Sequence, residues 1–340
     1  HELVESRRLF YPPDPASMKT CTIGGNVAEN AGGPHCLKYG VTRDYVLSID
    51  ALTGDGRPFT AGKAVHKNRA GYDLRHLLIG SEGTLAVFRE FTLKLIPKPE
   101  DRLLMLAYFG DFNKATEMVN IILHKGVQPS SLEFMDEFAI RAVETYAKLG
   151  IPEMCKALLF IEVDGRSEEM PSLKKRLEEC LTGAAFETRL AFDRKEQESL
   201  WEVRRKTSPA MRLFGNTKAN EDIVVPRKQV PAAIRGLREI SQTMRLDIIN
   251  FGHIGDGNIH VNIMYDGTNA DEKRRVEQAL EAVFGLVNTL GGAVSGEHGV
   301  GLAKKKYLPG NLDPVSYELM RAIKRDFDPN GILNPQKIFQ

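Results

Sequence analysis

The sequence has few cysteines, and none of them stands in a metal-binding motif. They are dispersed through the 340 residues, without any C-x-x-C spacing, at Cys21, Cys36, Cys155 and Cys180. The absence of such a spacing argues against an iron–sulfur cluster or a structural zinc site carried by this chain. Dispersed thiols are typical of a reducing compartment, where cysteine serves mainly as a small hydrophobic side chain.

An excess of one charge and long apolar runs are also missing. The sequence has 46 lysines and arginines against 45 aspartates and glutamates, a formal net charge of +1 at pH 7. This balance gives no electrostatic case for nucleic acid or an anionic membrane as a partner. No apolar run approaches the roughly 20 residues of a membrane span, and the start, His1–Arg8, has no apolar signal core. We expect a cytoplasmic protein without a transmembrane segment, either free or peripheral to a membrane-associated complex.

Internal repeats and low-complexity tracts are absent as well. A content of 42% hydrophobic and 27% charged residues is typical of a globular protein, and 340 residues allow two domains. The clearest boundary is Pro97–Asp101, where two prolines and charged residues separate two regular segments. We predict domains at residues 1–97 and 98–325, followed by a terminal segment at residues 326–340.

Beyond this boundary, segments with strand and helix periodicity alternate, and several strands are compatible with hairpins. This pattern predicts an α+β fold in which helices cover an antiparallel sheet. Strands are expected at residues 45–52, 103–109, 157–163, 186–192 and 223–225, and helices at residues 112–125, 133–149, 168–181, 196–206, 228–244, 270–290 and 314–325.

The segment Asn250–Asn262 predicts a hairpin, because Asp256-Gly257 is typical of a tight type I′ turn. A two-residue turn there would pair His253 with His260. Directly opposed residues point to one face, with Cβ atoms about 4.5–5.5 Å apart. Two imidazoles placed in this way can bind one metal ion, and Asn262 would lie on the same face. A register slipped by one residue would separate the two histidines.

Two histidines in a hairpin are more often a polar pair without a ligand. The segment Ser295–Gly301 favours a site here, because it holds a carboxylate and an imidazole between glycines that permit close packing. Glu297 could complete a His–His–Glu set for a divalent zinc, manganese or iron ion. His298 would then serve as a proton acceptor. We favour this metal site over the simple polar pair.

Residues 22–33 form a run of twelve residues with four glycines. Such a run lets main-chain amides approach a ligand, and consecutive N–H groups can bind an anion. The run matches neither the dinucleotide fingerprint nor the P-loop. By composition alone, a glycine-rich surface loop explains it equally well.

Taken together, these segments resemble the FAD-linked oxidases of the vanillyl-alcohol-oxidase type, in the branch of glycolate oxidase, D-lactate dehydrogenase and D-2-hydroxyglutarate dehydrogenase. The matching segments follow the family's order at residues 12–17, 22–33, 71–74, 80–85, 201–204, 221–226, 252–262, 296–299 and 334–335. The resemblance implies a partial FAD-binding domain of the VAO/PCMH type, followed by the family's C-terminal, ferredoxin-like cap domain. It also implies a preceding FAD subdomain that is missing here, so that FAD retention by this chain alone is an open question.

The resemblance further implies that the glycine-rich segments before Pro97 bind FAD and that the terminal turn returns beside the flavin. The residues expected to line the cofactor are Thr22, Gly24, Gly25, Asn26, Asn30, Gly32, Ser81, Glu82, Gly83, Thr84 and Asn334.

The implied activity is that of an oxidoreductase acting on the CH–OH group of a D-2-hydroxy acid, with hydride transfer to flavin N5. D-lactate and glycolate are the foremost substrates, and the product is the 2-oxo acid. The metal on the two histidines and Glu297 would lower the pKa of the substrate hydroxyl, and His298 would take its proton. Arg204 would bind the carboxylate as a bidentate partner, and Asn262 would hydrogen-bond substrate or ligand. Without the resemblance, Arg204 would be one charge among several on its helix.

Two other functions are left open by the sequence. One is a flavin-dependent transferase similar to alkylglycerone-phosphate synthase, although Glu221–Pro226 and the compact hairpin look more like the hydroxy-acid branch. The other is a non-catalytic subunit of a larger dehydrogenase complex. Because the chain has no cysteine cluster, its electrons would leave to a quinone, a cytochrome, a flavoprotein or an iron–sulfur subunit.

Overall fold

The computed structural model describes residues 1–339 and consists of two compact units. Unit 1 combines His1–Lys98 with the C-terminal segment that starts at Glu297, and unit 2 is Pro99–Gly296. The chain therefore leaves unit 1 once, forms unit 2, and returns. The domain limits expected from the sequence, residues 1–97, 98–325 and 326–340, stay predictions, and Gln340 lies outside the described residues.

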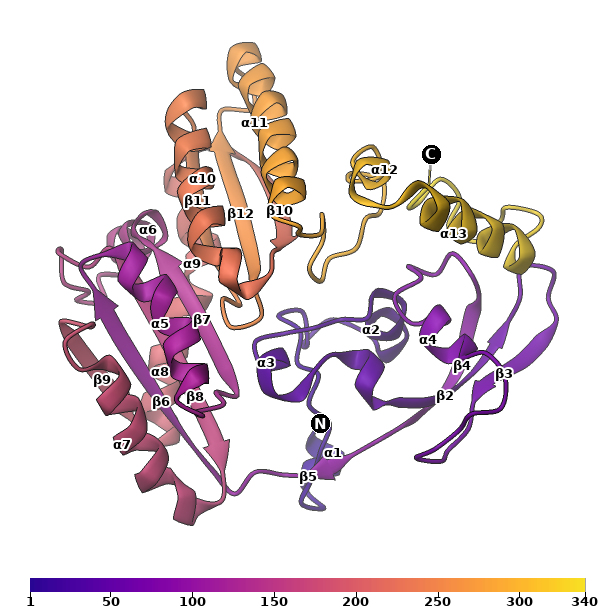
Figure 1. Ribbon diagram of the computed structural model, residues 1–340, viewed down its shortest axis with the longest axis horizontal. Coiled ribbons are helices and arrows are strands. Elements are labelled where there is room, and N and C mark those ends of the chain that lie inside the picture. Colours follow the sequence, from indigo (N-terminus) through magenta and orange to yellow (C-terminus); the bar gives the residue numbers. More distant parts are fainter. Residues whose placement is uncertain (340) are drawn as a thin grey trace. The chain divides into compact units, whose positions relative to one another are not determined.

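Unit 2 is built on a seven-stranded sheet with the strand order β10-β12-β11-β7-β8-β6-β9 (Figure 1). Every neighbouring pair of strands is antiparallel, as the sequence predicted. The strands are β6 (Asp101–Phe109), β7 (Ser131–Asp136), β8 (Ala157–Gly165), β9 (Glu187–Ala191), β10 (Thr217–Val224), β11 (Asp247–Gly252) and β12 (Asn258–Tyr265).

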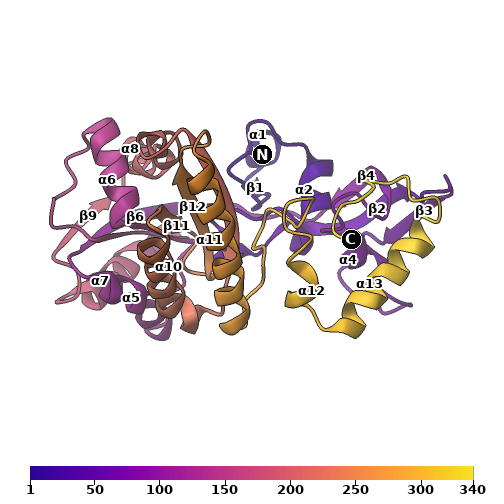
Figure 2. The same ribbon diagram turned by 90° about the horizontal axis from the view of Figure 1, so that it is seen from above.

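Helices cover both faces of this sheet (Figure 2). The strands β6 and β8 are nearly continuous apolar runs with buried side chains on both faces, and such strands require cover on each side. One face carries α6 (Glu137–Ala147), α8 (Arg194–Arg205) and α9 (Thr207–Ala210), whose apolar side chains join those of the sheet in one core cluster. The other face carries α5 (Phe112–His124), α7 (Met170–Leu181), α10 (Val230–Met244) and α11 (Ala270–Thr289). Unit 2 also contains the short 3-10 turns η2 (Ser167–Glu169), η3 (Met211–Leu213) and η4 (Arg227–Gln229).

The prediction of one helix over residues 133–149 was wrong at its start. Residues up to Asp136 belong to β7, which pairs with β8 and β11. In β7, successive side chains point to opposite faces of the sheet, as they do in any strand. Because helices cover both faces, all of these side chains are buried. The helix begins only at Glu137, because Asp136 caps it by accepting a hydrogen bond from the N–H of Ala139 at 2.9 Å. The other helices and strands predicted for unit 2 are present, and β10 extends back to Thr217.

The predicted hairpin between β11 and β12 is present, but its register differs from the prediction by two residues. Phe251 pairs with His260, and His253 stands opposite Asn258, whose N–H donates to the His253 carbonyl at 3.1 Å. The four-residue turn Ile254–Gly257 replaces the predicted two-residue turn. A shift of two residues keeps each side chain on its face, so the two histidines still share one face.

Unit 1 contains a three-stranded antiparallel sheet of order β3-β2-β4 and a two-stranded ribbon of β1 and β5. Its core combines apolar side chains of α2, β2 and α4, and the C-terminal helix packs against it with Ile323 and Phe327. Its elements are α1 (Glu2–Glu5), β1 (Leu9–Phe10), α2 (Ile23–Glu29), α3 (Cys36–Tyr39), η1 (Thr42–Tyr45), β2 (Val46–Leu52), β3 (Pro58–Gly62), α4 (Leu74–Leu78), β4 (Val87–Leu93), β5 (Ile96–Pro97), α12 (Leu308–Asn311) and α13 (Pro314–Phe327).

A glycine-rich surface loop was one of the two interpretations of residues 22–33, but most of this run is the helix α2. Thr22 caps the helix by accepting a hydrogen bond from the N–H of Gly25 at 3.0 Å. Asn30 ends it in the left-handed conformation, with φ of 51°. These two end signals outweigh the weak helix propensity of the glycines between them.

Candidate active site

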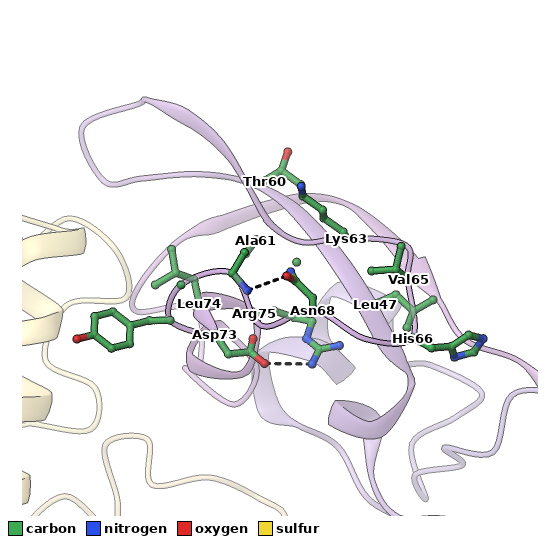
Figure 3. Close-up of a pocket in the computed structure, with 14 residues that line it drawn as sticks. Leu47, Thr60, Ala61, Lys63, Val65, His66, Asn68, Asp73, Leu74 and Arg75 are labelled. Carbon is green, nitrogen blue, oxygen red and sulfur yellow. Dashed lines mark hydrogen bonds and ion pairs between the residues drawn. The ribbon is translucent and has the colours of Figure 1, made fainter.

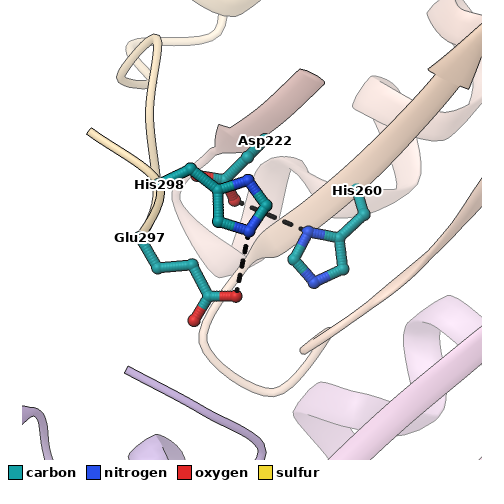
Figure 4. Close-up of side chains that lie close together, drawn as sticks. All are labelled: Asp222, His260, Glu297 and His298. Carbon is teal, nitrogen blue, oxygen red and sulfur yellow. Dashed lines mark ion pairs between the residues drawn. The ribbon is translucent and has the colours of Figure 1, made fainter. Parts of the chain in front are cut away.

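Three side chains from neighbouring strands form a row across the sheet of unit 2. The register pairs Asp222 of β10 with His260 of β12, and His260 with Phe251 of β11. Directly opposed residues point to the same face, which here is the face covered by α6 and α8. His260 Nδ1 lies 3.6 Å from Asp222 Oδ1 (Figure 4), and the His260 and Phe251 rings meet edge to face at 5.6 Å. The row therefore places a buried imidazole between a carboxylate and an aromatic ring.

His253 lies in the next row of the same face, beside Glu133. Continuing the β7–β11 register from the pair of Phe251 and Met135 places His253 opposite Glu133. The Nδ1–H of His253 donates a hydrogen bond to Glu133 Oε1. The centroid of its ring lies 5.1 Å from that of His260. The structure thus brings the two histidines of the predicted metal site together.

Arg204 reaches the same cluster from α8. Its Nε and Nη2 both lie 3.0 Å from Glu133 Oε2, and its guanidinium lies over the Phe251 ring at 4.4 Å from the centroid. Leu200 and Val203 on the same helix are buried in the core cluster, which holds α8 against the sheet with Arg204 facing inward. The predicted carboxylate-binding residue is therefore tied to the histidine cluster.

Glu133 carries the negative charge of this cluster and is 1% exposed. Burial by itself would raise the pKa of its carboxyl group, but the neighbouring His253 and Arg204 outweigh burial and lower that pKa to about 2. The group is therefore ionised at neutral pH and accepts hydrogen bonds with both oxygens. One oxygen serves His253 and the other serves Arg204.

Asp222 fixes the end of the unit 2 chain. Its carboxylate accepts hydrogen bonds from Asn258 Nδ2 at 2.5 Å, from Ser295 Oγ at 3.0 Å and from the N–H of Gly296 at 2.9 Å. Gly296, the last residue of unit 2, is therefore bonded to the side chain of Asp222, and Asp222 stands opposite His260.

Asn262 lies one pair further along the same face and is fully buried. Its Nδ2 donates to the carbonyls of His260 at 3.2 Å and Ile249 at 3.3 Å. Its Oδ1 has no hydrogen-bond partner within residues 1–339. A buried acceptor left unpaired costs about 1–3 kcal/mol. This oxygen fits the predicted contact of Asn262 with substrate or ligand.

In unit 1, the segments predicted to bind the cofactor pack against one another. The N–H of Gly80 donates to the Val27 carbonyl at 3.0 Å, and that of Glu82 to the Ala28 carbonyl at 2.7 Å, so the turn rests on α2. Asn334 returns to this turn and donates from Nδ2 to the Glu82 carbonyl at 2.5 Å. The glycine-rich run, the turn at residues 81–84 and the terminal segment therefore form one cluster.

Several side chains of this cluster are already engaged with the main chain of unit 1, namely those of Thr22, Asn30, Glu82 and Thr84. These residues could serve a cofactor only through their remaining polar atoms and their backbone. Asn26 is buried in α2, and Gly24, Gly25, Gly32 and Gly83 offer main chain alone. Ser81 differs, because its buried Oγ has no partner in the described part of the chain. This hydroxyl fits a site that presents a polar group to a ligand.

Glu297 and His298 open the segment that returns to unit 1. A Cβ on Gly32 would come within 2.9 Å of Glu297 Oε2, so the glycine makes room for this carboxylate. His298 Nε2 lies 3.7 Å from Glu297 Oε1, and the His298 side chain is 47% exposed (Figure 4). The Glu82 carboxylate then accepts the N–H groups of Val300–Gly301 at 2.6 and 2.8 Å, which fixes the course of the segment.

A separate cavity of about 340 Å³ lies between β3 and the loop at residues 63–73 of unit 1 (Figure 3). Its most strongly basic side chain, Arg75, donates to the Val46 carbonyl at 2.7 Å and to Asp73 at 3.2 Å. Because none of the predicted site residues lines this cavity, we assign it no part in the candidate site.

Sequence reasoning missed Glu133 and Asp222 as members of the site. Glu133 was placed in a helix, and Asp222 was used only within a matching segment. Glu133 lies in a strand whose residues are all buried, and Asp222 lies in the buried part of β10. Since a buried carboxylate requires a cationic or hydrogen-bonding partner, that position was the available signal.

Comparison with known proteins gives the family. Residues 98–338 match the family "FAD linked oxidases, C-terminal domain", and residues 1–62 match the "FAD binding domain" family. The chain belongs to the FAD-linked oxidases. The predicted family and flavoprotein class are thereby confirmed, and the two matched domains support FAD as the cofactor.

Two curated relatives of this FAD-linked oxidase are named for hydroxy acids. Glycolate oxidase subunit GlcD of Bacillus subtilis (strain 168) is 42% identical over 337 residues, which are 99% of this chain and 72% of that protein. The D-lactate dehydrogenase of Anaerostipes hadrus is 33% identical over 343 residues, which cover 98% of this chain and 72% of that protein. The predicted enzyme class, an FAD-linked oxidoreductase of hydroxy acids, is in agreement with both names.

Solved structures share the fold of this FAD-linked oxidase. p-Cresol methylhydroxylase with bound substrate has a TM-score of 0.78 at 14% identity, over 99% of this chain and 73% of that one. An alkyldihydroxyacetonephosphate synthase has a TM-score of 0.68 at 17% identity, over 98% of this chain and 61% of that one. Identities this low show the fold alone, and the predicted VAO/PCMH-type fold is confirmed.

Proposed function

We propose that this FAD-linked oxidase converts a D-2-hydroxy acid or glycolate, with D-lactate and glycolate foremost, to the 2-oxo acid. The observation that carries this proposal is the buried cluster of His253, His260, Glu133 and Arg204 on one face of the sheet. Imidazoles bind metal ions, and a guanidinium matches a carboxylate. A 2-hydroxy acid carries a hydroxyl and a carboxylate on adjacent carbons, so one small molecule would engage both groups. The names of the two relatives support the same substrate class.

The metal of this proposal is a zinc, manganese or iron ion on His253, His260 and Glu297. The hydrogen bond from His253 Nδ1 to Glu133 turns Nε2 away from that carboxylate, and Nε2 would be the ligand atom. Glu297 directly follows Gly296, whose N–H is held by the carboxylate opposite His260. Chain connectivity therefore supports Glu297 as the third ligand. The ion would supply Lewis acidity toward the substrate hydroxyl.

The FAD of this proposal belongs to unit 1. Its proposed contacts are Thr22, Gly24, Gly25, Asn26, Asn30, Gly32, Ser81, Glu82, Gly83, Thr84 and Asn334, and the unpaired Ser81 Oγ supports this assignment. Bound FAD would supply the acceptor for the hydride that leaves C2 of the substrate.

The side chains of this chain would then divide the remaining work. Arg204 would orient the substrate through its carboxylate, and Asn262 Oδ1 would accept a hydrogen bond from the substrate or from a ligand. His298 would take the hydroxyl proton, because its half-exposed imidazole can pass that proton on to water. The two hydrogens removed from the substrate are thus accounted for as one hydride and one proton.

We further propose that the protein works with partner subunits. The Bacillus subtilis relative is named as a subunit, and a quinone, cytochrome, flavoprotein or iron–sulfur subunit would receive the electrons. Within residues 1–339, no helix combines the length and the apolar surface that crossing a membrane requires. A cytoplasmic site, free or at the periphery of a membrane-associated complex, stays a prediction.

The test is an anaerobic visible spectrum of the purified chain supplemented with FAD, before and after addition of D-lactate, L-lactate or glycolate. We expect the flavin bands to bleach with D-lactate or glycolate and to persist with L-lactate. Flavin that none of a panel of 2-hydroxy acids bleaches would contradict the proposal and favour a transferase. A chain that binds no FAD would favour a non-catalytic subunit.

A further inference from the structure

Glu133 connects two groups that come from different elements. It lies in β7, while His253 follows β11 and Arg204 lies in α8. The three residues are distant in sequence, by 120 positions for Glu133 and His253 and by 71 for Glu133 and Arg204. One buried carboxylate thus holds a strand end and a helix together on the face that carries His260.

Each contact of Glu133 constrains the group it touches. A carboxylate on Nδ1–H fixes both the tautomer and the ring orientation of a histidine, as it does for metal-binding histidines in general. The guanidinium of Arg204 is held through Nε and Nη2 on one oxygen and by the Phe251 ring beneath it. The Nη1 edge is the part of the fork that is turned away from Glu133.

We infer that Glu133 is a positioning residue that sets His253 and Arg204 relative to each other, so that metal binding and substrate-carboxylate binding depend on one side chain. This inference rests on the proposed function, because the roles of His253 and Arg204 come from it. The new element is that metal binding and substrate-carboxylate binding are coupled through Glu133. A substitution of Arg204 therefore alters metal affinity, although Arg204 is not a metal ligand.

A purely structural ion pair would stabilise unit 2 without this coupling. Glu162 provides the matched control, because it is also 1% exposed and lies in the neighbouring strand β8. Its carboxylate accepts hydrogen bonds from Trp201 Nε1 at 3.0 Å and from Ser130 Oγ at 3.2 Å. Glu162 touches α8, as Glu133 does, and its partners Trp201 and Ser130 are not proposed ligands.

The experiment compares Glu133→Gln with Glu162→Gln in the full chain. Glutamine keeps the shape of the side chain but offers one acceptor oxygen, so it cannot serve His253 and Arg204 together. Affinity for Mn²⁺ and Zn²⁺ is measured by competition with a chelator, and KM and kcat for D-lactate or glycolate are measured on the metal-loaded protein. We expect Glu133→Gln to weaken metal binding by about 10–100-fold and to raise KM more than it lowers kcat. Glu162→Gln should leave metal affinity and KM within about twofold of the wild type.

Arg204→Met provides a second route if Glu133→Gln does not fold. It keeps Glu133 and an apolar side chain over Phe251, and it should weaken metal binding by several-fold. Unchanged metal affinity in Glu133→Gln or Arg204→Met, with an active wild type, would overturn this inference alone. A wild type that binds metal but oxidises no hydroxy acid would contradict the proposed function, while the metal affinities would still decide the coupling. A wild type that binds no metal would contradict both.

Discussion

The imidazole of His253 meets that of His260 edge to face, with ring centroids 5.1 Å apart and ring planes at 84°. The two residues are not opposite each other across the hairpin, because His260 pairs with Phe251. They are diagonal neighbours on one face. Glu133 holds one ring and Asp222 flanks the other. Two imidazoles this close on one face, one of them oriented by a carboxylate, are suited to binding one metal ion between them.

Replacing His260 by alanine should therefore remove the metal. The change takes away one of three proposed protein ligands, and we expect metal binding to weaken by more than about tenfold, at least the loss typical of removing an outer-shell partner. Elemental analysis after gel filtration measures the metal per chain, and substrate-dependent bleaching of the flavin should be lost with it. His124→Ala, an exposed position at the end of α5, is the control that should keep its metal. Full metal content in His260→Ala would contradict the proposed set of metal ligands.

Replacing His298 by alanine should separate proton transfer from metal binding. As the proposed proton acceptor, His298 is expected to contribute about 10²–10⁴-fold to the rate of flavin reduction. Anaerobic stopped-flow measurements with D-lactate or glycolate give that rate, and elemental analysis should find the metal unchanged. His66→Ala, on an exposed loop of unit 1, is the control. Loss of metal from His298→Ala would mean that His298 is a ligand instead of the proton acceptor.

The sequence predicted most elements beyond residue 97 because their periodicity is local and strong. The helices α5 and α10 and the strand β8 each bury a regular pattern of apolar side chains. The α2 helix was missed, since the glycines conceal two end signals at Thr22 and Asn30. The hairpin register was missed because the turn has two more residues than its most typical form, although the face was predicted correctly.

Glu133 could not be assigned a role from its neighbours in sequence. Its partners His253 and Arg204 are 120 and 71 positions away, and a single acidic residue in a short apolar segment is compatible with a strand or a helix end. Only the pairing of β11 with β7 and the packing of α8 on that face of the sheet bring the three residues together. No local pattern of the chain predicts long-range pairing of this kind.

Gly252→Ala should destabilise unit 2. Gly252 has φ of 149°, and an added Cβ would lie 2.8 Å from the Asn258 carbonyl oxygen and 3.2 Å from the backbone nitrogen of His260. Strain of this kind costs about 1–3 kcal/mol, and the shift should also weaken metal binding. The fluorescence of Trp201, the only tryptophan of the chain, reports urea unfolding of this unit. Gly285→Ala is the control: it lies in α11 with open space around it and should raise stability by up to about 1 kcal/mol.

If Gly252→Ala and the control shift the unfolding midpoint in the same direction, the backbone of Gly252 does not carry the strain described. A destabilised Gly252→Ala that keeps full metal affinity would separate the stability of the hairpin from the site that it presents.

Asp136 should make the stability of unit 2 fall as the pH rises from about 4 to 6. Burial raises the pKa of this carboxyl group to about 6, against the hydrogen bonds from Ala139 and Asn250 that lower it. Between the ordinary value of 3.8 and the raised one, the folded state holds a proton that the unfolded state has lost. Unfolding then releases a proton, so the free energy of unfolding falls by up to about 1.4 kcal/mol per pH unit in this window.

The measurement is the difference in the free energy of unfolding between the wild type and Asp136→Asn, followed by Trp201 fluorescence in urea at several pH values from 4 to 7. The free energy of unfolding of the wild type, relative to that of Asp136→Asn, should decrease as the pH rises to about 6 and stay constant at higher pH. Asp111→Asn makes the same change in an exposed carboxylate that caps α5, and it accounts for the effect of replacing a capping aspartate by asparagine. A difference that grows with pH would mean that the three N–H donors around Asp136 outweigh its burial, because the folded state would then favour the ionised carboxylate.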